Sequence, residues 1–287
     1  MLMKLIKEEQ VTFSHCVPTI LNLIVNHPKA NEKGVLDRVK MVIGGAALPK
    51  GLAQAALEKG INVLTGYGMS ETCPIISIAY LSESMQQELT KEQQLDERVK
   101  TGRAVLFVEA KLMDDDSNFL PHDGKSVGEL VVRAPWLTQR YYKEEERSEE
   151  LWEHGYLHTG DMAVIEPNGT IIIVDRKKDV IKSGGEWISS LELEGFISTH
   201  PAVKEAAIIG IPDEKWDERP FALIIPHDGQ SIQEDDIKTH LLKFAETGEL
   251  SKWAIPEAYR FVSEIPKTSV GKIDKKEIRK MYVEKKI

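Results

Sequence analysis

Two short apolar strands on either side of one helix constrain the fold of this chain more than any other feature. Val39–Ile43 reads as a strand that runs into a glycine pair, and Ile61–Leu64 reads as a second strand. The stretch between them, Leu48–Gly60, has Pro49 near its start and a glycine at its end, which is typical of a helix. This order predicts parallel strands, and ligands usually approach parallel sheets at the carboxyl ends of the strands.

The rest of the sequence predicts one more strand and helix before this unit, at Val11–Phe13 and Pro18–Val25. Ser82–Lys100 is very polar and predicts a solvated surface helix. A β-rich module follows, with short strands at Val105–Met113, Val127–Arg133, Ala163–Glu166 and Thr170–Asp175. Beyond Asp179 we expect a helix capped by Ser189 or Ser190, strands at Val203–Gly210 and Phe221–Pro226, and helices at Ile232–Thr247 and Lys276–Glu284. The fold class is therefore α/β plus α+β.

Composition argues against several classes of protein. Lys and Arg number 37 against 46 Asp and Glu, so the net charge is −9, which disfavours broad wrapping of nucleic acid. The two cysteines, Cys16 and Cys73, stand in unrelated contexts, so we expect neither a disulfide scaffold nor a cysteine-based zinc site. There is no signal-peptide core, and no run approaches the ~20 apolar residues that span a bilayer. We expect a cytoplasmic protein with no transmembrane segment and no nucleic-acid partner.

Two clusters in the first half of the chain have the composition of a nucleotide site. In Gly66–Thr72, glycines allow close approach of a ligand, Tyr67 offers a ring to stack on a base, Ser70 a hydroxyl for phosphate and Glu71 an oxygen ligand for Mg²⁺. In His158–Asp161, a carboxylate after a Thr-Gly turn can accept both hydroxyls of a ribose. Taken singly, each cluster is more simply explained as an ordinary turn.

Two further clusters are basic. Asp175–Ile188 carries four cations, followed by Gly184, Gly185 and Trp187, at the boundary between the β-rich module and the last domain. In Pro266–Asp274, Gly271 suggests a turn tip that projects Lys272. The simpler explanations are a solvated strand and a surface lysine.

Taken together, in this order and approximate spacing, the four clusters resemble the adenylate-forming enzymes, the superfamily of acyl-CoA synthetases, firefly luciferase and peptide-synthetase adenylation domains. Lys182–Ser190 and Ile211–Pro220 look especially like the medium- and long-chain fatty-acyl-CoA synthetases. The resemblance runs from about Val39 to Lys280. It implies a remnant of the large N-terminal adenylation domain over residues 1–177, then a small mobile C-terminal domain over 178–287 with its hinge near Lys178.

The resemblance implies a fatty-acid:CoA ligase that uses ATP, Mg²⁺ and CoA. A carboxylate would first form an acyl-adenylate with release of pyrophosphate, and the CoA thiol would then displace AMP. The implied catalytic residues are Lys272, which would bridge the carboxylate and the α-phosphate, Ser70 on the α-phosphate, and Glu71 on Mg²⁺. Gly44, Gly45 and Ala46 would line the adenine and acyl region. The other implied nucleotide-site residues are Thr65, Gly66, Tyr67, Asp161, Arg176, Lys178 and Lys182, and those along the passage for CoA and the acyl group are Gly184, Gly185 and Trp187.

The chain departs from the family at the phosphate-binding loop, a Ser/Thr/Gly-rich segment that ends in Pro-Lys-Gly. Pro49-Lys50-Gly51 lacks the preceding run and lies in the strand–helix unit. The chain therefore resembles the C-terminal half of such an enzyme, and its expected partner is the missing N-terminal region; the resemblance also leaves a homodimer open. An expressed fragment, a truncated product and a split protein all remain open. The alternative functions are a CoA ligase for an aryl or short sulfur-containing acid, and a non-catalytic nucleotide-binding fragment.

Overall fold

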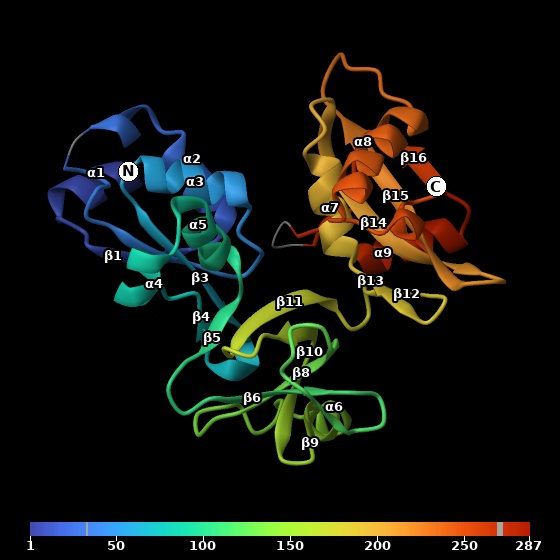
Figure 1. Ribbon diagram of the computed structural model, residues 1–287, viewed down its shortest axis with the longest axis horizontal. Helices are drawn as coiled ribbons and strands as arrows, with labels where there is room; N and C mark the ends of the chain where they lie inside the picture. The colour runs from blue at the N-terminus through green and yellow to red at the C-terminus, as the bar shows by residue number, and fades with distance from the viewer. Residues whose placement is uncertain (33, 269–271) are drawn as a thin grey trace. The chain divides into compact units, whose positions relative to one another are not determined.

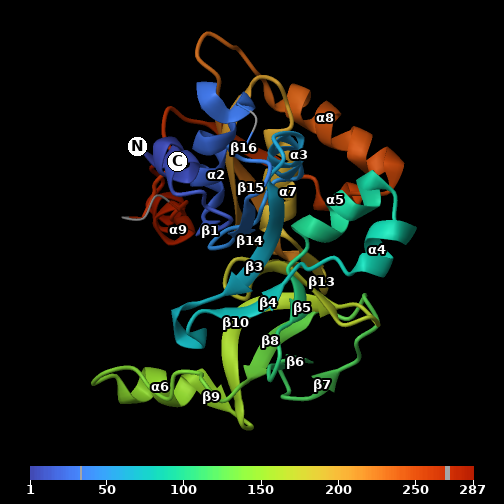
Figure 2. The same ribbon diagram turned by 90° about the vertical axis from the view of Figure 1, so that its left-hand side faces the viewer.

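The computed structural model describes residues 1–32, 34–268 and 272–287. Contacts between residues divide the chain into two compact units, Met1–Ile173 (unit 1) and Val174–Ile287 (unit 2). Figure 1 shows the elements of both units along the colour gradient, and Figure 2 shows them from a second side.

Unit 1 begins with the predicted α/β arrangement, except that the first strand, expected at Val11–Phe13, lies at Phe13–Cys16. Strands β1 (Phe13–Cys16), β2 (Lys40–Ile43) and β3 (Asn62–Gly68) pair in parallel, with Ile43 opposite both Cys16 and Thr65. The flanking helices are α1 (Leu2–Glu8), α2 (Pro18–Val25), α3 (Lys50–Glu58) and the short 3-10 turn η1 (Pro28–Asn31). Their apolar faces and the sheet form one core, which includes Leu21, Met41, Ala53 and Val63. The predicted strand–helix–strand unit is confirmed, with Pro49 as the residue before α3.

The sheet continues beyond β3 with antiparallel strands. Its order is β1-β2-β3-β4-β5-β11-β10-β8-β6-β7, and β9 pairs with β10. The strands that follow β3 in the chain are β4 (Ile75–Ile78), β5 (Gly102–Ala104), β6 (Glu109–Met113), β7 (Phe119–Leu120), β8 (Gly128–Arg133), β9 (Trp152–Glu153), β10 (Tyr156–Ile165) and β11 (Thr170–Arg176). The predicted β-rich module is therefore confirmed.

Strand β3 is longer than predicted, because it runs through Gly68 rather than ending at Leu64. It pairs with β4 at Gly66, Tyr67 and Gly68. A side chain at Gly68 would place its Cβ 1.6 Å from the carbonyl oxygen of Pro74, so only glycine permits this close pairing. The tyrosine between the two glycines is thus fixed on a strand rather than on a free turn.

Two other predicted elements are wrong in their extent. The predicted strand Val105–Met113 begins only at Glu109, because a turn closes at Val105–Val108 and Phe107 adopts a φ of 68°. The predicted surface helix is two helices, α4 (Glu83–Glu88) and α5 (Lys91–Val99), each capped by a side-chain hydroxyl, from Ser82 and Thr90. Helix α5 is also not solvated all round, because Leu95 and Arg98 are buried.

The predicted Thr-Gly turn at His158–Asp161 is also wrong, since these residues lie inside β10. The pairing of β10 with β8 shifts register between His158 and Met162, which is the signature of a β-bulge. Gly160 lies within this bulge and adopts a φ of 68°. The glycine is needed here for a strand irregularity rather than for a chain reversal.

Unit 2 is a small α+β fold around a sheet of order β13-β12-β15-β14, with β16 beside β15. Residues alternate across this sheet: Ile208 and Ile224 pack with helices α7 and α8, whereas Ile209 and Leu223 pack with α9. The elements are β12 (Ile181–Ser183), β13 (Glu186–Ile188), α7 (Ser190–Ser198), β14 (Val203–Asp213), β15 (Asp217–Pro226), α8 (Glu234–Thr247), η3 (Lys252–Ala254), β16 (Ala258–Phe261) and α9 (Lys275–Val283). The predicted strands and helices of this domain are all present, and Ser189 is the cap of α7.

Two chemical features are not found in the described part of the chain. None of its helices is long and apolar enough to cross a membrane. Its His, Cys, Asp and Glu side chains do not gather in threes as a metal site would require.

Candidate functional site

Tyr67 and Asp161 form the best-defined polar contact among the predicted site residues. The Tyr67 hydroxyl donates to Oδ2 of Asp161 at 2.5 Å, from β3 to β10. Asp161 is only 3% exposed, and its backbone N–H donates to Oγ1 of Thr159. Two residues assigned separately from sequence are thus brought together in unit 1.

The bulge that carries Asp161 is held by a residue that the sequence did not single out. Oε1 of Glu129, on β8, accepts from the backbone N–H of Gly160 at 3.1 Å, and Oε2 lies 3.3 Å from Nδ1 of His158. Thr159 donates its hydroxyl to the carbonyl of Leu130 at 2.6 Å. Strand β8 therefore holds the three residues directly before Asp161 in place.

The carboxyl end of β2 and the adjoining part of β3 supply the other predicted nucleotide-site residues of unit 1. Gly45 is exposed two residues after β2, and Thr65 and Gly66 lie in the middle of β3, where Thr65 is opposite the last residue of β2. A Cβ at Gly44 would come within 2.9 Å of the carbonyl oxygen of Gly66, so the two chain segments approach closely here. The buried hydroxyl of Thr65 has no hydrogen-bond partner among the described residues, which leaves it able to bind a ligand.

Glu71 and Ser70 lie on the short 3-10 turn η2 (Ser70–Thr72), directly after β3. The Tyr141 hydroxyl donates to Oε1 of Glu71 at 2.7 Å, and the Glu71 carbonyl accepts from the N–H of Thr138 at 2.9 Å. Burial, followed by the bond to Glu71, raises the pKa of Tyr141. Ser70 is exposed. Sequence reasoning missed Tyr141, because it lies 70 positions away from its partner.

Lys272 belongs to unit 2 and is exposed. Its backbone N–H donates to Oγ1 of Thr268 at 3.2 Å, and its carbonyl accepts from the Thr268 N–H at 2.7 Å. These bonds and a bridge between Lys267 and Ile273 join the two arms that lead to the predicted turn tip. Gly271, where the tip was expected, lies outside the described residues.

Lys178 lies in the turn between β11 and β12 and is exposed, as is Arg176 at the end of β11. The turn closes through bonds from the N–H groups of Asp179 and Val180 to the carbonyl of Arg176. The Lys178 carbonyl accepts from Nη2 of Arg279 on α9 at 2.9 Å. The expected hinge residue is therefore held at its backbone, while its side chain faces solvent.

Gly184 and Gly185 form the turn of the β12–β13 hairpin, with φ values of 59° and 87°. Lys182 and Trp187 are directly opposite each other, and Nζ of Lys182 lies 5.0 Å from the Trp187 ring centroid. The Gly184 N–H donates to the Trp216 carbonyl at 2.9 Å, and a Cβ at Gly184 would meet the Trp216 ring at 2.8 Å. Position 184 therefore requires glycine for two reasons, namely its positive φ and the closeness of the Trp216 ring.

This hairpin borders a cavity of about 590 Å³ that lies wholly in unit 2. Its wall combines the indole rings of Trp216 and Trp253 with three cations and two carboxylates, which are Arg219, Lys238, Lys252, Glu186 and Glu257. Arg219 donates to the Trp253 carbonyl at 2.7 Å and to Glu257 at 2.9 Å, whereas its buried Nε has no partner among the described residues. The sequence contained a sign of this site in Trp216–Pro220, but no role had been assigned to it.

Comparison with known proteins follows the same division of the chain. The family model described as AMP-binding enzyme matches residues 1–142, and the model described as AMP-binding enzyme C-terminal domain matches residues 192–272. A long-chain-fatty-acid–CoA ligase of Thermus thermophilus is 38% identical over 282 residues, which are 98% of this chain and 51% of the ligase. A 3-methylmercaptopropionyl-CoA ligase of Ruegeria lacuscaerulensis is 38% identical over 279 residues, which are 97% of this chain and 50% of that ligase.

The fold is similar to that of solved structures. An o-succinylbenzoate CoA synthetase from Bacillus subtilis, solved in complex with its acyl-adenylate intermediate, matches with a TM-score of 0.81 and 25% identity. The match covers 97% of this chain and 53% of that chain. The chain thus spans about half the length of the curated relatives and of the solved structure that it matches.

Proposed function

The chain belongs to the AMP-binding enzyme family, and on that premise we propose that it works as part of a fatty-acid:CoA ligase whose other half carries the phosphate loop. In the first step a carboxylate oxygen attacks the α-phosphorus of ATP, and pyrophosphate leaves. In the second step the CoA thiol attacks the acyl carbon, and AMP leaves. The Tyr67–Asp161 contact carries this proposal, because it joins a ring that can stack on adenine to a carboxylate that can accept ribose hydroxyls.

Unit 1 would hold the adenosine part of the nucleotide. Tyr67 supplies the stacking face, Asp161 accepts from the ribose, and the Thr65 hydroxyl, which has no partner among the described residues, offers a hydrogen bond to the base. Gly45 and Gly66 contribute no side chains to this region. Ser70 would donate its hydroxyl to the α-phosphate, and Arg176 would assist at the ribose or the phosphates.

Glu71 fits a Mg²⁺ ion that is bound mainly through nucleotide phosphates and water. A single carboxylate is typical of such sites, and no cluster of three acidic, His or Cys residues occurs in the described part of the chain. The ion would supply positive charge beside the phosphates. Tyr141 would orient the Glu71 carboxylate through its 2.7 Å hydrogen bond.

Lys272 is proposed as the residue that makes adenylation fast. An exposed ammonium can lie between two anions, the attacking carboxylate and the α-phosphate, and so reduce their repulsion. Loss of one such contact costs about 3–4 kcal/mol of barrier, or ~10²–10³ in rate. Unit 2 would turn about Lys178 between the two steps, which moves Lys272 away and brings the β12–β13 hairpin to the reaction.

The cavity of unit 2 is proposed to bind the nucleotide end of CoA. That end carries several phosphates and an adenine, which match the cations and the indole rings of the wall. A volume of about 590 Å³ lies within the usual range for small-molecule sites. Lys182, Gly184, Gly185 and Trp187 would then line the path of the pantetheine arm towards the acyl group.

The test is to join this chain to the upstream half of the Thermus relative and to follow pyrophosphate release with ATP and fatty acids of increasing length. Release that depends on the acid, followed by AMP and thioester formation when CoA is added, is the expected result. A reaction without acid and a Lys272→Ala variant are the controls. No release with any acid would overturn the proposal.

A second acid class is favoured by one comparison, since the 3-methylmercaptopropionyl-CoA ligase is as similar to this chain as the fatty-acid ligase is. The same joined enzyme, incubated with fatty, aryl and sulfur-containing acids together, identifies the preferred acid from the masses of the thioesters. Because the chain spans about half of these relatives, a nucleotide-binding role without turnover is the third candidate. Calorimetric binding of AMP with no pyrophosphate release in the joined enzyme would support that role.

A further inference from the structure

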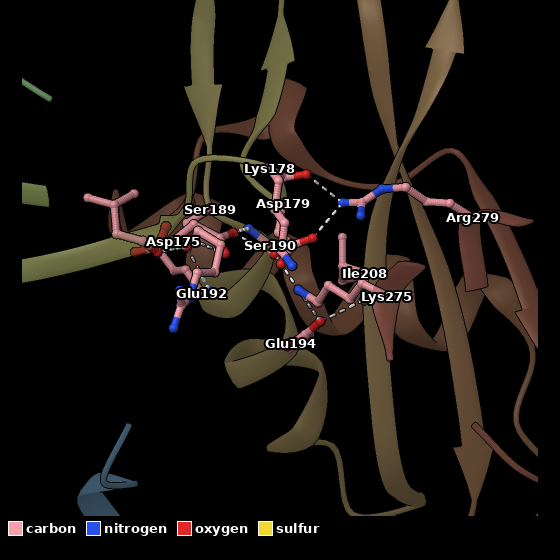
Figure 3. A network of polar contacts seen from close by, with 12 residues as sticks. Asp175, Lys178, Asp179, Ser189, Ser190, Glu192, Glu194, Ile208, Lys275 and Arg279 are labelled. Atoms are coloured by element: carbon pink, nitrogen blue, oxygen red, sulfur yellow. Dashed lines mark hydrogen bonds and ion pairs between the residues drawn. The ribbon is translucent and has the colours of Figure 1, made fainter. Parts of the chain in front are cut away.

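Val174 and Asp175 lie directly before the turn that contains Lys178, and both form hydrogen bonds with residues at the start of α7. Figure 3 shows this network of polar contacts. Oδ2 of Asp175 accepts from both the backbone N–H and the hydroxyl of Ser190, at 2.6 and 2.5 Å. The hydroxyl of Ser189 donates to the carbonyl of Val174 at 2.6 Å. Asp175 is 1% exposed and Ser190 is fully buried, so water does not compete for these bonds.

A buried cation supports this contact from the other side. Lys275, at the start of α9, donates its ammonium to the Ser190 hydroxyl and to Oε1 of Glu194, the latter at 2.8 Å. Glu194 also accepts from the backbone N–H of Ile208 on β14 at 2.8 Å. Asp175 therefore bonds to a serine whose own position is fixed by α9 and, through Glu194, by the sheet.

A separate contact fixes the residues that follow Lys178. Nη2 of Arg279 donates to the Lys178 carbonyl at 2.9 Å and to Oδ1 of Asp179 at 2.7 Å. The carbonyl of Lys178 and the N–H of Asp179 belong to one planar peptide group, which lies after the rotatable φ and ψ bonds of Lys178. Arg279 thus holds the chain on the C-terminal side of those bonds.

The two sets of contacts differ in what a rotation at Lys178 would do to them. The Arg279 side chain, the Lys178 carbonyl and Asp179 would all move together, so the hydrogen bonds from Arg279 to the other two groups would persist. Asp175 lies before Lys178 and Ser190 lies after it, so a large rotation would separate them. The same holds for Val174 and Ser189.

We propose that Asp175 and Ser190 form a latch across the pivot, which holds the linker in one conformation and opens before unit 2 turns. The inference rests on the proposed function in one respect, namely that Lys178 is the pivot. Asp175 and Ser190 are positioning residues here, because neither touches the reacting groups. Lys275 keeps Ser190 in place when the latch is open, since its own contacts lie after the pivot.

Limited digestion of the 287-residue chain with trypsin tests the latch. Trypsin cleaves after Arg176, Lys177 and Lys178, and it requires an opened, extended segment. When opening is fast relative to cleavage, the cleavage rate follows the population of the open form. Mass spectrometry measures this rate against cleavage after Lys143, an exposed site in unit 1 that serves as an internal reference.

Asp175→Asn and Ser190→Ala are each expected to raise linker cleavage about tenfold or more. The first leaves one neutral acceptor oxygen for the three donors that the carboxylate now accepts from, and the second removes the buried hydrogen bond from the Ser190 hydroxyl to that carboxylate. The effect of the double variant is expected to be smaller than the product of the two single effects, because both changes act on the bond between the Ser190 hydroxyl and Asp175. The matched control is Thr199→Val, at the other end of α7, where the hydroxyl bonds to Phe196 and His240 and to no other residue in the described part of the chain. Its linker cleavage should equal that of the wild type.

Wild-type cleavage in both single variants would overturn the latch, as would a double variant whose effect is the product of the two single effects. If Ser190→Ala unfolds unit 2, cleavage rises throughout residues 174–287, and the isosteric Asp175→Asn then decides the outcome alone. The assay needs neither ATP nor turnover. A failed pyrophosphate assay therefore counts against the ligase and leaves the latch untouched.

Discussion

The hydroxyl of Tyr67 and the carboxylate of Asp161 meet at 2.5 Å across 94 positions of the chain. One comes from the last strand of the parallel part of the sheet, and the other from a bulged strand of the antiparallel part. Neither residue would be positioned in this way without the strands between them. The pair therefore gives a direct way to perturb the proposed adenosine site.

Tyr67→Phe should weaken AMP binding by about tenfold, because it leaves a buried carboxylate oxygen of Asp161 without this donor while keeping the stacking ring. Titration calorimetry of the 287-residue chain with AMP measures the change. The matched control is Tyr156→Phe, which breaks another tyrosine–carboxylate bond, to Glu109, within the same β-rich part. Equal affinities for both variants and the wild type would contradict the assigned role.

Lys272→Ala, made in the chain joined to its upstream half, should slow adenylation by ~10²–10³. Thioester formation from supplied acyl-adenylate and CoA should be much less affected, since the lysine is proposed to act only in the first step. Lys267→Ala provides the control, because Lys267 is a nearby lysine that forms a bridge with Ile273 and pairs with Glu205. Similar losses in both half-reactions would exclude a step-specific role for Lys272.

Gly184→Ala should destabilise unit 2 by about 1–3 kcal/mol, because it combines a positive φ with a Cβ that meets the Trp216 ring at 2.8 Å. Gly195→Ala is the contrasting substitution, since Gly195 lies within α7 and a Cβ there meets no atom within 4 Å. It should stabilise the unit by about 0.4–1 kcal/mol. Urea unfolding monitored by tryptophan fluorescence compares the two, and a loss of stability in both would refute the distinction.

Unfolding should also depend on pH through His240. Burial lowers its pKa, the hydrogen bond to the Phe196 carbonyl opposes burial in part, and the neighbouring His200 and Lys243 lower the pKa further by smaller amounts. The unfolded chain therefore binds more protons below the ordinary His pKa of 6.5, and the stabilising contribution is lost as the pH falls through the lower folded value. His240→Gln should flatten the rise in unfolding free energy between about pH 5 and 7. An unchanged slope would rule out this contribution.

Local sequence patterns were sufficient to predict an element when neighbouring residues alone determine where it begins or ends. The strand before Gly44, the helix after Pro49 and the cap at Ser189 follow from apolar spacing, proline and serine placement, and the structure has all three. The same patterns failed at Phe107, a bulky residue with positive φ inside an apolar run, because side-chain spacing carries no information about such a turn.

The candidate site was predictable in its residue types but not in its partners. Glu129 acts on Gly160 from 31 positions away, and Tyr141 acts on Glu71 from 70 positions away, so no window of sequence contains either pair. The roles of Lys178, Lys272 and the CoA passage stay predictions. Arg219 was within a quoted motif, yet its burial against Trp253 depends on the approach of η3 to β15, which only the folded sheet defines.

Strands β14 and β15 remain paired from Val203 opposite Pro226 to Asp213 opposite Asp217, and the Asp213 carboxylate closes their turn by accepting from the N–H groups of Lys215 and Trp216. The indole of Trp216 and the guanidinium of Arg219 therefore reach the cavity from one continuous hairpin. Any molecule that occupies the cavity meets both side chains through that hairpin, so a change within residues 213–219 alters the two contacts together.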